Sequence, residues 1–256
     1  MAIIVKSEFM KLKRYFIVWI GISLMLLNVL LTLFTSVADD GMKWDFQFLY
    51  EQVVKNFVTL IFPMCITLIT GYIISREYTD DTLKNIITIP VSFQKILAGK
   101  LIISAMLSVL LGAVCFIFTV VASFIMGYGG FKISTALIGL LQIALLGLFL
   151  YLTMLPIIVL TSRKKGSFLV GVIIAFVYGF IGMFVNGTLQ SIYPVTATLG
   201  LIRYRNGAEG VTWHTGLCLI SVLAMCAIGV ALMFLKPKFE NQDIKKTKRV
   251  APKKGW

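Results

Sequence analysis

The chain has 256 residues, of which 59% are hydrophobic and 14% are charged, and its mean hydropathy is +0.93. Soluble domains are about half apolar and a quarter charged, so this composition excludes a soluble globular domain. Membrane topology and anionic lipid headgroups account for the net charge of +13, so binding of nucleic acid is not expected.

Six blocks along the chain contain no Lys, Arg, Asp or Glu. A helix needs about 20 residues to cross about 30 Å of hydrocarbon, and the unbroken apolar runs lack the alternation of barrel strands. We therefore predict an all-α membrane protein with six transmembrane helices, the first an uncleaved anchor that is too long for a signal core. The predicted spans are 16–37, 56–75, 101–127, 133–162, 167–187 and 211–235, in a single transmembrane domain over 1–235 with a basic cytoplasmic tail over 236–256.

The loop between the second and third predicted spans has a pattern of its own. Thr79 can cap a short helix, Asp80 and Asp81 suit its first turn, and Pro90 ends it. Its apolar positions share one face, so this helix either rests on the lipid surface or docks a cytoplasmic partner. The candidate docking residues are Glu77, Thr79, Asp80, Asp81, Thr82, Leu83, Lys84, Ile86, Ile87 and Pro90.

The fifth predicted span carries small residues at every fourth position: Ser167, Gly171, Ala175 and Gly179. Such a stripe lets two helices approach closely. It is a candidate face for a dimer, homomeric or heteromeric, and the alternative is tight packing within one subunit.

The uncharged stretch from 166 to 202 is too long for one crossing, because a single helix of that length would reach about 55 Å. Asn186-Gly187 and Pro194 are the expected break points. They leave 188–202 as a short piece, which we predict to be a re-entrant or interfacial segment on the external side. Nearby, Tyr193, Arg203 and Arg205 are candidate contacts for a substrate or a lipid phosphate, or else rim charges.

The distribution of basic residues predicts the topology. With the N-terminus in the cytoplasm, 19 of the 24 Lys and Arg residues fall on cytoplasmic segments. A seventh crossing would move the basic tail outside, against the positive-inside rule. We therefore expect a multi-pass protein of the cell membrane with both termini in the cytoplasm.

Titrating groups are missing from the middle of the predicted spans. The single histidine, His214, opens the sixth block, and no paired acids or metal-ligand cluster can be assembled. Proton-coupled carriers place such groups inside the bilayer, so an ion-coupled carrier is disfavoured. A driving force for transport, if there is one, must come from elsewhere.

The loop after the second span also resembles that of a known family, the permeases of the ABC-2 exporter class. An N-terminal amphipathic segment and the six spans extend the resemblance over the whole chain, which is most similar to small permeases of bacitracin or lantibiotic immunity in Gram-positive bacteria. Asp81 stands where the family often has Gly. The residues that carry the resemblance are Glu77, Thr82-Leu83, Pro90-Val91-Ser92, Lys95-Ile96-Leu97, Gly99-Lys100 and the N-terminal Lys11-Leu12-Lys13-Arg14.

The resemblance implies that the short cytoplasmic helix is a coupling helix on an ABC ATPase subunit, and that the segment between spans five and six is re-entrant. The chain has no G-x-x-x-x-G-K-[ST] loop, so ATP and Mg are expected on the partner, and this chain is expected to be neither an enzyme nor a cofactor binder. The implied activity is export of an antimicrobial peptide, with a second permease. The alternatives are a non-transporting immunity or scaffold protein, or a permease for lipid, polysaccharide or ion.

Overall fold

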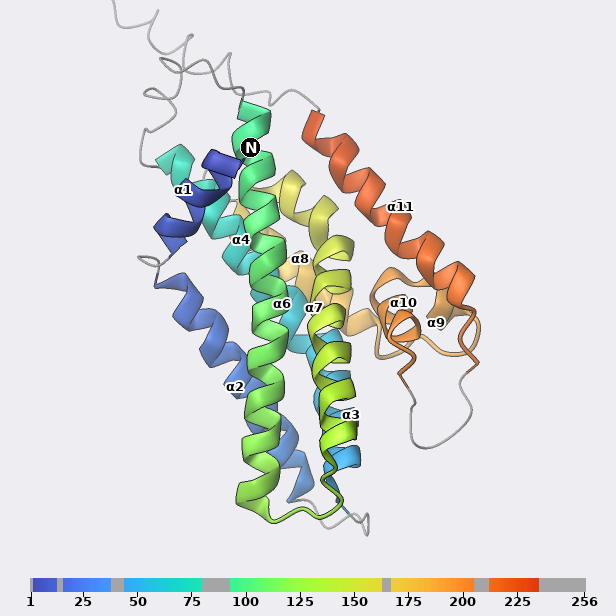
Figure 1. Cartoon of the computed structure of the whole chain (residues 1–256). Coiled ribbons are helices and arrows are strands. Elements are labelled where there is room, and N and C mark those ends of the chain that lie inside the picture. The colour runs from blue at the N-terminus through green and yellow to red at the C-terminus, as the bar shows by residue number, and fades with distance from the viewer. Residues whose placement is uncertain are drawn as a thin grey trace, which may run out of the picture.

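The computed structural model describes residues 2–12, 16–37, 44–79, 93–162, 167–204 and 212–234, and every regular element in these ranges is a helix (Figure 1). The elements are α1 (Ala2–Leu12), α2 (Ile17–Ser36), α3 (Phe46–Asn56), the π-helical η1 (Phe57–Ile61), α4 (Phe62–Thr79), α6 (Phe93–Met126), α7 (Ile133–Thr161), α8 (Phe168–Ile181), α9 (Leu189–Ile192), α10 (Pro194–Leu201) and α11 (Thr215–Phe234). The all-α prediction is confirmed for the described residues.

Five helices in the described ranges are long and apolar enough to cross a membrane: Ile17–Ser36, Phe46–Arg76, Gln94–Met126, Ile133–Thr161 and Thr215–Phe234. The fifth predicted span corresponds to α8, which has 14 residues and a length of about 21 Å. This is shorter than the hydrocarbon core. The chain therefore crosses the membrane several times, and the count of six stays a prediction.

The second span begins earlier than the sequence predicts. The uncharged block begins after Lys55, so the sequence predicts that this span starts at 56, yet the helix starts at Phe46 and continues through η1 into α4. Asp45 caps it, accepting a hydrogen bond from Phe48 N at 2.8 Å. Glu51 and Lys55 consequently lie inside a long apolar helix. Both lie among the first ten residues of this helix of 31 residues, so the absence of titrating groups from the middle of the spans stays a prediction.

The core lies where α4, α6 and α7 meet, and glycines set the closest approach. A Cβ on Gly112 of α6 would lie 2.6 Å from Ile143 O, and one on Gly147 of α7 would lie 2.6 Å from Ser108 O. Close backbone approach at small residues is the common way to pack helices in lipid. Tyr151 adds a buried hydrogen bond from its hydroxyl to Leu101 O at 2.8 Å, so α6 and α7 form a rigid pair.

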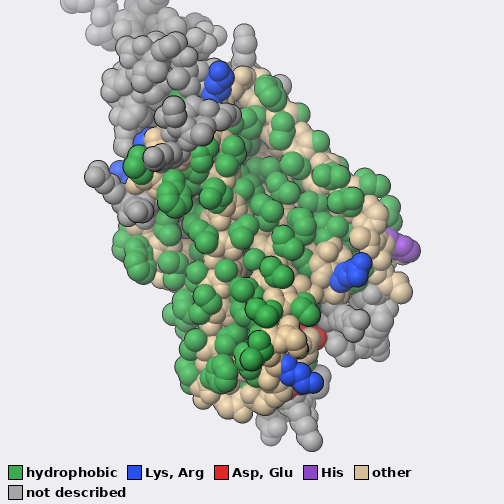
Figure 2. All heavy atoms as spheres, in the orientation of Figure 1, with side chains coloured by type: hydrophobic (Ala, Val, Ile, Leu, Met, Phe, Trp, Pro, Cys, Tyr) green, Lys and Arg blue, Asp and Glu red, His purple; other side chains and the backbone are tan. Residues whose placement is uncertain are grey.

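The helices α2 and α11 flank this core, and α11 lies at the edge of the bundle (Figure 1). Large apolar side chains on both are exposed, among them Leu30 and Phe34 of α2 and Ile220 of α11. Figure 2 shows hydrophobic side chains over most of the visible face. A surface of this kind is expected to face lipid.

The stretch between α8 and α11 breaks as the sequence predicts. After α8, Gly187 has a φ of +65°, and Pro194 is the first residue of α10. Both residues suit a chain that leaves one helix and starts another. The stretch forms two short helices, α9 and α10, which pack against α11 and α7.

Candidate functional site

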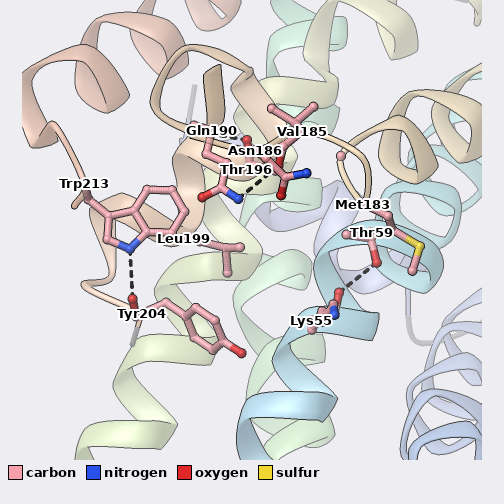
Figure 3. Close-up of a pocket in the computed structure, with 11 residues that line it drawn as sticks. Lys55, Thr59, Met183, Val185, Asn186, Gln190, Thr196, Leu199, Tyr204 and Trp213 are labelled. Carbon is pink, nitrogen blue, oxygen red and sulfur yellow. Dashed lines mark hydrogen bonds between the residues drawn. The ribbon is translucent and has the colours of Figure 1, made fainter. Parts of the chain in front are cut away.

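A cavity of about 120 Å³ lies between the π-helical segment and the chain after α8 (Figure 3). Its walls come from η1 and the end of α3 on one side, and from the turn after α8, α9, α10 and the approach to α11 on the other. The lining residues are Lys55, Thr59, Gly182, Met183, Val185, Asn186, Gln190, Thr196, Leu199, Tyr204 and Trp213.

The π-helical turn shapes one wall. Phe62 N donates to Phe57 O, five residues back, which is the hydrogen bond of a π-helix. The Thr59 carbonyl points at α8, where a Cβ on Gly179 would lie 2.7 Å from it. The Thr59 hydroxyl turns back and donates to Lys55 O at 2.8 Å. The helices therefore touch at Gly179, and the cavity opens beyond this contact because α8 ends at Ile181.

The opposite wall is fixed by hydrogen bonds between its own residues. Gln190 Nε2 donates to Val185 O at 2.9 Å, and the Thr196 hydroxyl donates to Gln190 O at 2.8 Å. Trp213 Nε1 donates to Tyr204 O at 3.0 Å. These bonds hold the segment after α8 in one shape, so the cavity is built into the fold.

Arg203 ends α10 in the left-handed conformation, with a φ of 53°. Its N–H donates to Gly200 O and the N–H of Tyr204 donates to Leu199 O, which together form a Schellman motif. The turn directs Tyr204 inward, where its hydroxyl donates to Glu51 O at 2.8 Å. Burial, and secondly the charge of Glu51, raises the pKa of Tyr204, which keeps this phenol protonated as a donor.

Of the candidate substrate or lipid contacts singled out from the sequence, Tyr193 and Arg203 are not among the residues that line the cavity. The Arg203 side chain is exposed, and Arg205 lies outside the described residues. Tyr193 is half-buried and donates its hydroxyl to Tyr178 O. Burial raises the pKa of Tyr193 to about 12. In this structure Tyr193 joins α8 to the segment that follows it.

The small-residue stripe of α8 packs inside the chain. Gly171, Ala175 and Gly179 are buried, and a Cβ on Gly171 would lie 2.8 Å from Thr161 Cβ. Ser167 is half-buried. The structure shows intrasubunit packing, the alternative that the sequence left open, so these glycines and Ala175 offer no free face to a second permease in this conformation.

At the other end of the bundle, a buried ion pair fixes α1 to α6. Lys100 Nζ lies 2.8 Å from Glu8 Oε2 and donates to Ile73 O at 3.3 Å, and Lys11 Nζ lies 2.6 Å from Glu8 Oε1. Glu8 is 5% exposed and Lys100 is 2% exposed. Burial alone would raise the pKa of Glu8, but the hydrogen bonds and charges of Lys100 and Lys11 outweigh it and hold that pKa below 4.5.

The predicted coupling helix follows α4 along the chain. Glu77 and Thr79 lie in the last turn of α4. The other candidates, Asp80, Asp81, Thr82, Leu83, Lys84, Ile86, Ile87 and Pro90, lie outside the described residues, so their role stays a prediction.

Comparison with known proteins identifies the fold described above. A family model described as ABC-2 family transporter protein matches residues 4–182. The chain belongs to this family.

This ABC-2 permease is also similar to the bacitracin transport permease protein BCRB of Bacillus licheniformis. The two are 27% identical over 164 residues, which is 64% of this chain and 77% of that protein. The resemblance inferred from the loop residues is thereby confirmed at the level of the family. Transport, rather than catalysis by this chain, is the role of such a permease subunit.

The family match ends at Gly182, so the cavity of this ABC-2 permease spans the boundary of the matched region. Lys55 and Thr59 lie within it, whereas Asn186, Gln190 and Thr196 lie beyond it. The sequence did not single out Lys55, because this residue lies just before the predicted second span, 56–75. The signal that was available is Asp45 followed by an amphipathic run, which is typical of a capped helix start.

Proposed function

We propose that this permease removes antimicrobial peptide of the bacitracin or lantibiotic type from the membrane, for self-protection or resistance. The observation that carries the proposal is the similarity to the bacitracin transport permease over 164 residues. The apolar side chains exposed over much of the bundle are compatible with a membrane-inserted cargo.

The proposed energy source is a separate ABC ATPase that binds ATP and Mg and docks on the loop over 80–92. The ion pair of Glu8 and Lys100 supports this proposal, because it stiffens the helix ends from which the loop departs. Figure 1 places α1, the end of α4, the start of α6 and the end of α11 toward the same end of the bundle. This arrangement supports six crossings with both termini in the cytoplasm, with α8 and the segment after it serving as the fifth.

A second permease, identical or different, completes the proposed transporter. One helical bundle of this size has too few helices to surround a peptide, so two bundles are needed to line a transport path. The exposed apolar face of α8, which includes Ile173 and Val177, faces away from the buried stripe and is available for lipid or for the second subunit.

The coupling loop provides the test of this function. Leu83→Asp places a charge on the apolar docking face, and Asp80→Lys reverses a charge there. Each variant is expected to abolish the ATP hydrolysis that depends on the permease. The control is Val250→Asp in the basic tail, which is expected to leave hydrolysis unchanged. Coupled hydrolysis by both loop variants would contradict the proposed docking site, and so would labelling of a cysteine at position 83 from outside intact cells.

A non-transporting immunity protein is the second candidate, since sequestering a peptide needs the same apolar surface. Cells that carry the permease with a catalytically inactive ATPase distinguish the two functions. The proposed exporter predicts loss of resistance in these cells, whereas resistance that persists would favour sequestration. Panels of lipid, polysaccharide and ion cargoes in the same cells test the other cargo classes.

A further inference from the structure

Lys55 is a cation in an unusual place. It lies within the apolar helix Phe46–Arg76, between the fully buried pairs Val53-Val54 and Phe57-Val58, yet its own side chain is exposed. A lysine inside the bilayer costs about 2.5–3.5 kcal/mol at its centre and less toward the interface, so such residues generally serve a function. No carboxylate forms an ion pair with Lys55 among the residues that the structure describes.

The nearest acid along the helix is engaged elsewhere. Glu51 lies one turn before Lys55, is buried, and accepts a hydrogen bond from Gln47 Nε2 at 2.8 Å. Its backbone carbonyl accepts from Tyr204. No group in the described part of the chain neutralises the positive charge of Lys55. The charge is therefore available to an anion that is not part of the chain.

The surroundings of Lys55 favour an anion. Figure 3 shows Lys55 and Thr59 on one side of the cavity, and Asn186, Gln190 and Thr196 across from them. These are a cation and neutral hydrogen-bonding groups, and none of the described residues that line the cavity is acidic. The Thr59 and Thr196 hydroxyls already donate to Lys55 O and Gln190 O. The donors left for a phosphate oxygen are the Lys55 ammonium and the second N–H of the Asn186 and Gln190 amides.

The size of the cavity suits a headgroup. Its volume of about 120 Å³ is several times the ~15 Å³ that one water requires on the same measure. A tetrahedral phosphate with bridging water fits in this space, while a folded peptide does not.

The segment that forms the polar wall of the cavity also carries exposed apolar side chains, which point to the source of the anion. Phe184 is 70% exposed, Leu189 is 61% exposed and Ile192 is 52% exposed, and all three lie on the segment that forms the polar wall. A soluble anion gains nothing from exposed aromatic and aliphatic side chains, whereas the acyl chains of a lipid pack against them. Polar groups inside and apolar groups outside match an amphiphile.

We propose that this cavity binds the phosphate of a membrane lipid, with Lys55 as its counter-charge, Asn186, Gln190 and Thr196 as polar neighbours, and Phe184, Leu189 and Ile192 against the acyl chains. This lipid site needs neither ATP nor peptide, so it stands apart from the proposed cargo and from the ATPase. The bound lipid would join the π-helical turn to the segment after α8.

The test uses the full-length permease, purified in detergent, and native mass spectrometry of added phosphatidylglycerol. Lys55→Gln is expected to weaken binding about tenfold or more, because a charge-assisted contact is lost, and Lys55→Arg to retain most of it. The matched control is Lys132→Gln, which removes an exposed cation at the start of α7 away from the cavity. Asn186→Leu, on the exposed wall, gives a second variant that is expected to fold and to weaken binding.

Three results would overturn the lipid site. The first is binding by Lys55→Gln and Asn186→Leu within about twofold of the unchanged chain, measured on preparations with the same thermal unfolding. The second is equal binding of dioleoylglycerol, which has the acyl chains without the phosphate. The third is displacement of phosphatidylglycerol by millimolar inorganic phosphate, which would assign the site to the free anion.

Discussion

Two regions of the permease treat charge in opposite ways. At the end that holds α1, Lys100 is buried, forms an ion pair with Glu8 and donates a hydrogen bond to Ile73 O. Its charge is therefore balanced inside the protein. In the last turn of α3, Lys55 is exposed beside a cavity lined by neutral polar groups. A buried pair holds structure only while both partners are present, whereas an unpaired cation at an open cavity can be removed at little cost to folding. The first arrangement fixes a helix, and the second is suited to binding.

The largest expected effect is loss of one partner of the buried pair. Lys100→Met removes the buried counter-charge of Glu8 and leaves it only the half-exposed Lys11, so the docking of α1 should be destabilised by about 3 kcal/mol. Limited proteolysis of the first residues and thermal unfolding in detergent measure this loss.

The double variant Glu8→Leu with Lys100→Met is the control, because it replaces the pair by apolar groups and should recover most of the stability. If the single variant were as stable as the unchanged chain, the ion pair would not hold α1. By contrast, Lys55→Gln should leave thermal unfolding unchanged, which tests the other side of the comparison.

An intermediate effect is expected where α8 meets the π-helical wall of the cavity. Gly179→Val places a Cβ 2.7 Å from Thr59 O and should cost about 1–3 kcal/mol through overpacking. Gly216→Val in α11 is the matched control, since a Cβ there has nothing within 4 Å. A stripe that served a dimer instead would respond differently, with changed association of subunits and unchanged unfolding of the dissociated chain.

The smallest expected effect concerns Arg203. Its left-handed backbone costs about 1 kcal/mol relative to glycine, so Arg203→Gly should raise thermal stability slightly. Arg203→Ala keeps the Cβ and should give no such gain. Peptide resistance in the same two variants separates a backbone role from a side-chain role, because a contact to cargo would be lost in both.

The sequence predicted the helical class and the break between α8 and α11, because apolar block length and Pro194 act locally. It misplaced the start of the second span, since Lys55 and Glu51 interrupt an apolar run that the capped helix nevertheless continues through. The cavity could not be predicted, because its walls join residues more than 100 positions apart and no local pattern encodes that contact. The role of the stripe depended likewise on which surface packs against Gly179.

The π-helical turn at Phe57–Ile61 has a consequence for relatives of this chain. It accommodates one residue more than an α-helix of the same rise, and each residue of an α-helix turns the chain by about 100°. A homologue with an unbroken α-helix would therefore carry a different residue where Lys55 stands, even where the two chains align without a gap. Whether a relative retains Lys55 therefore has to be judged from the rotation of its helix, because identical residues in an alignment are not sufficient.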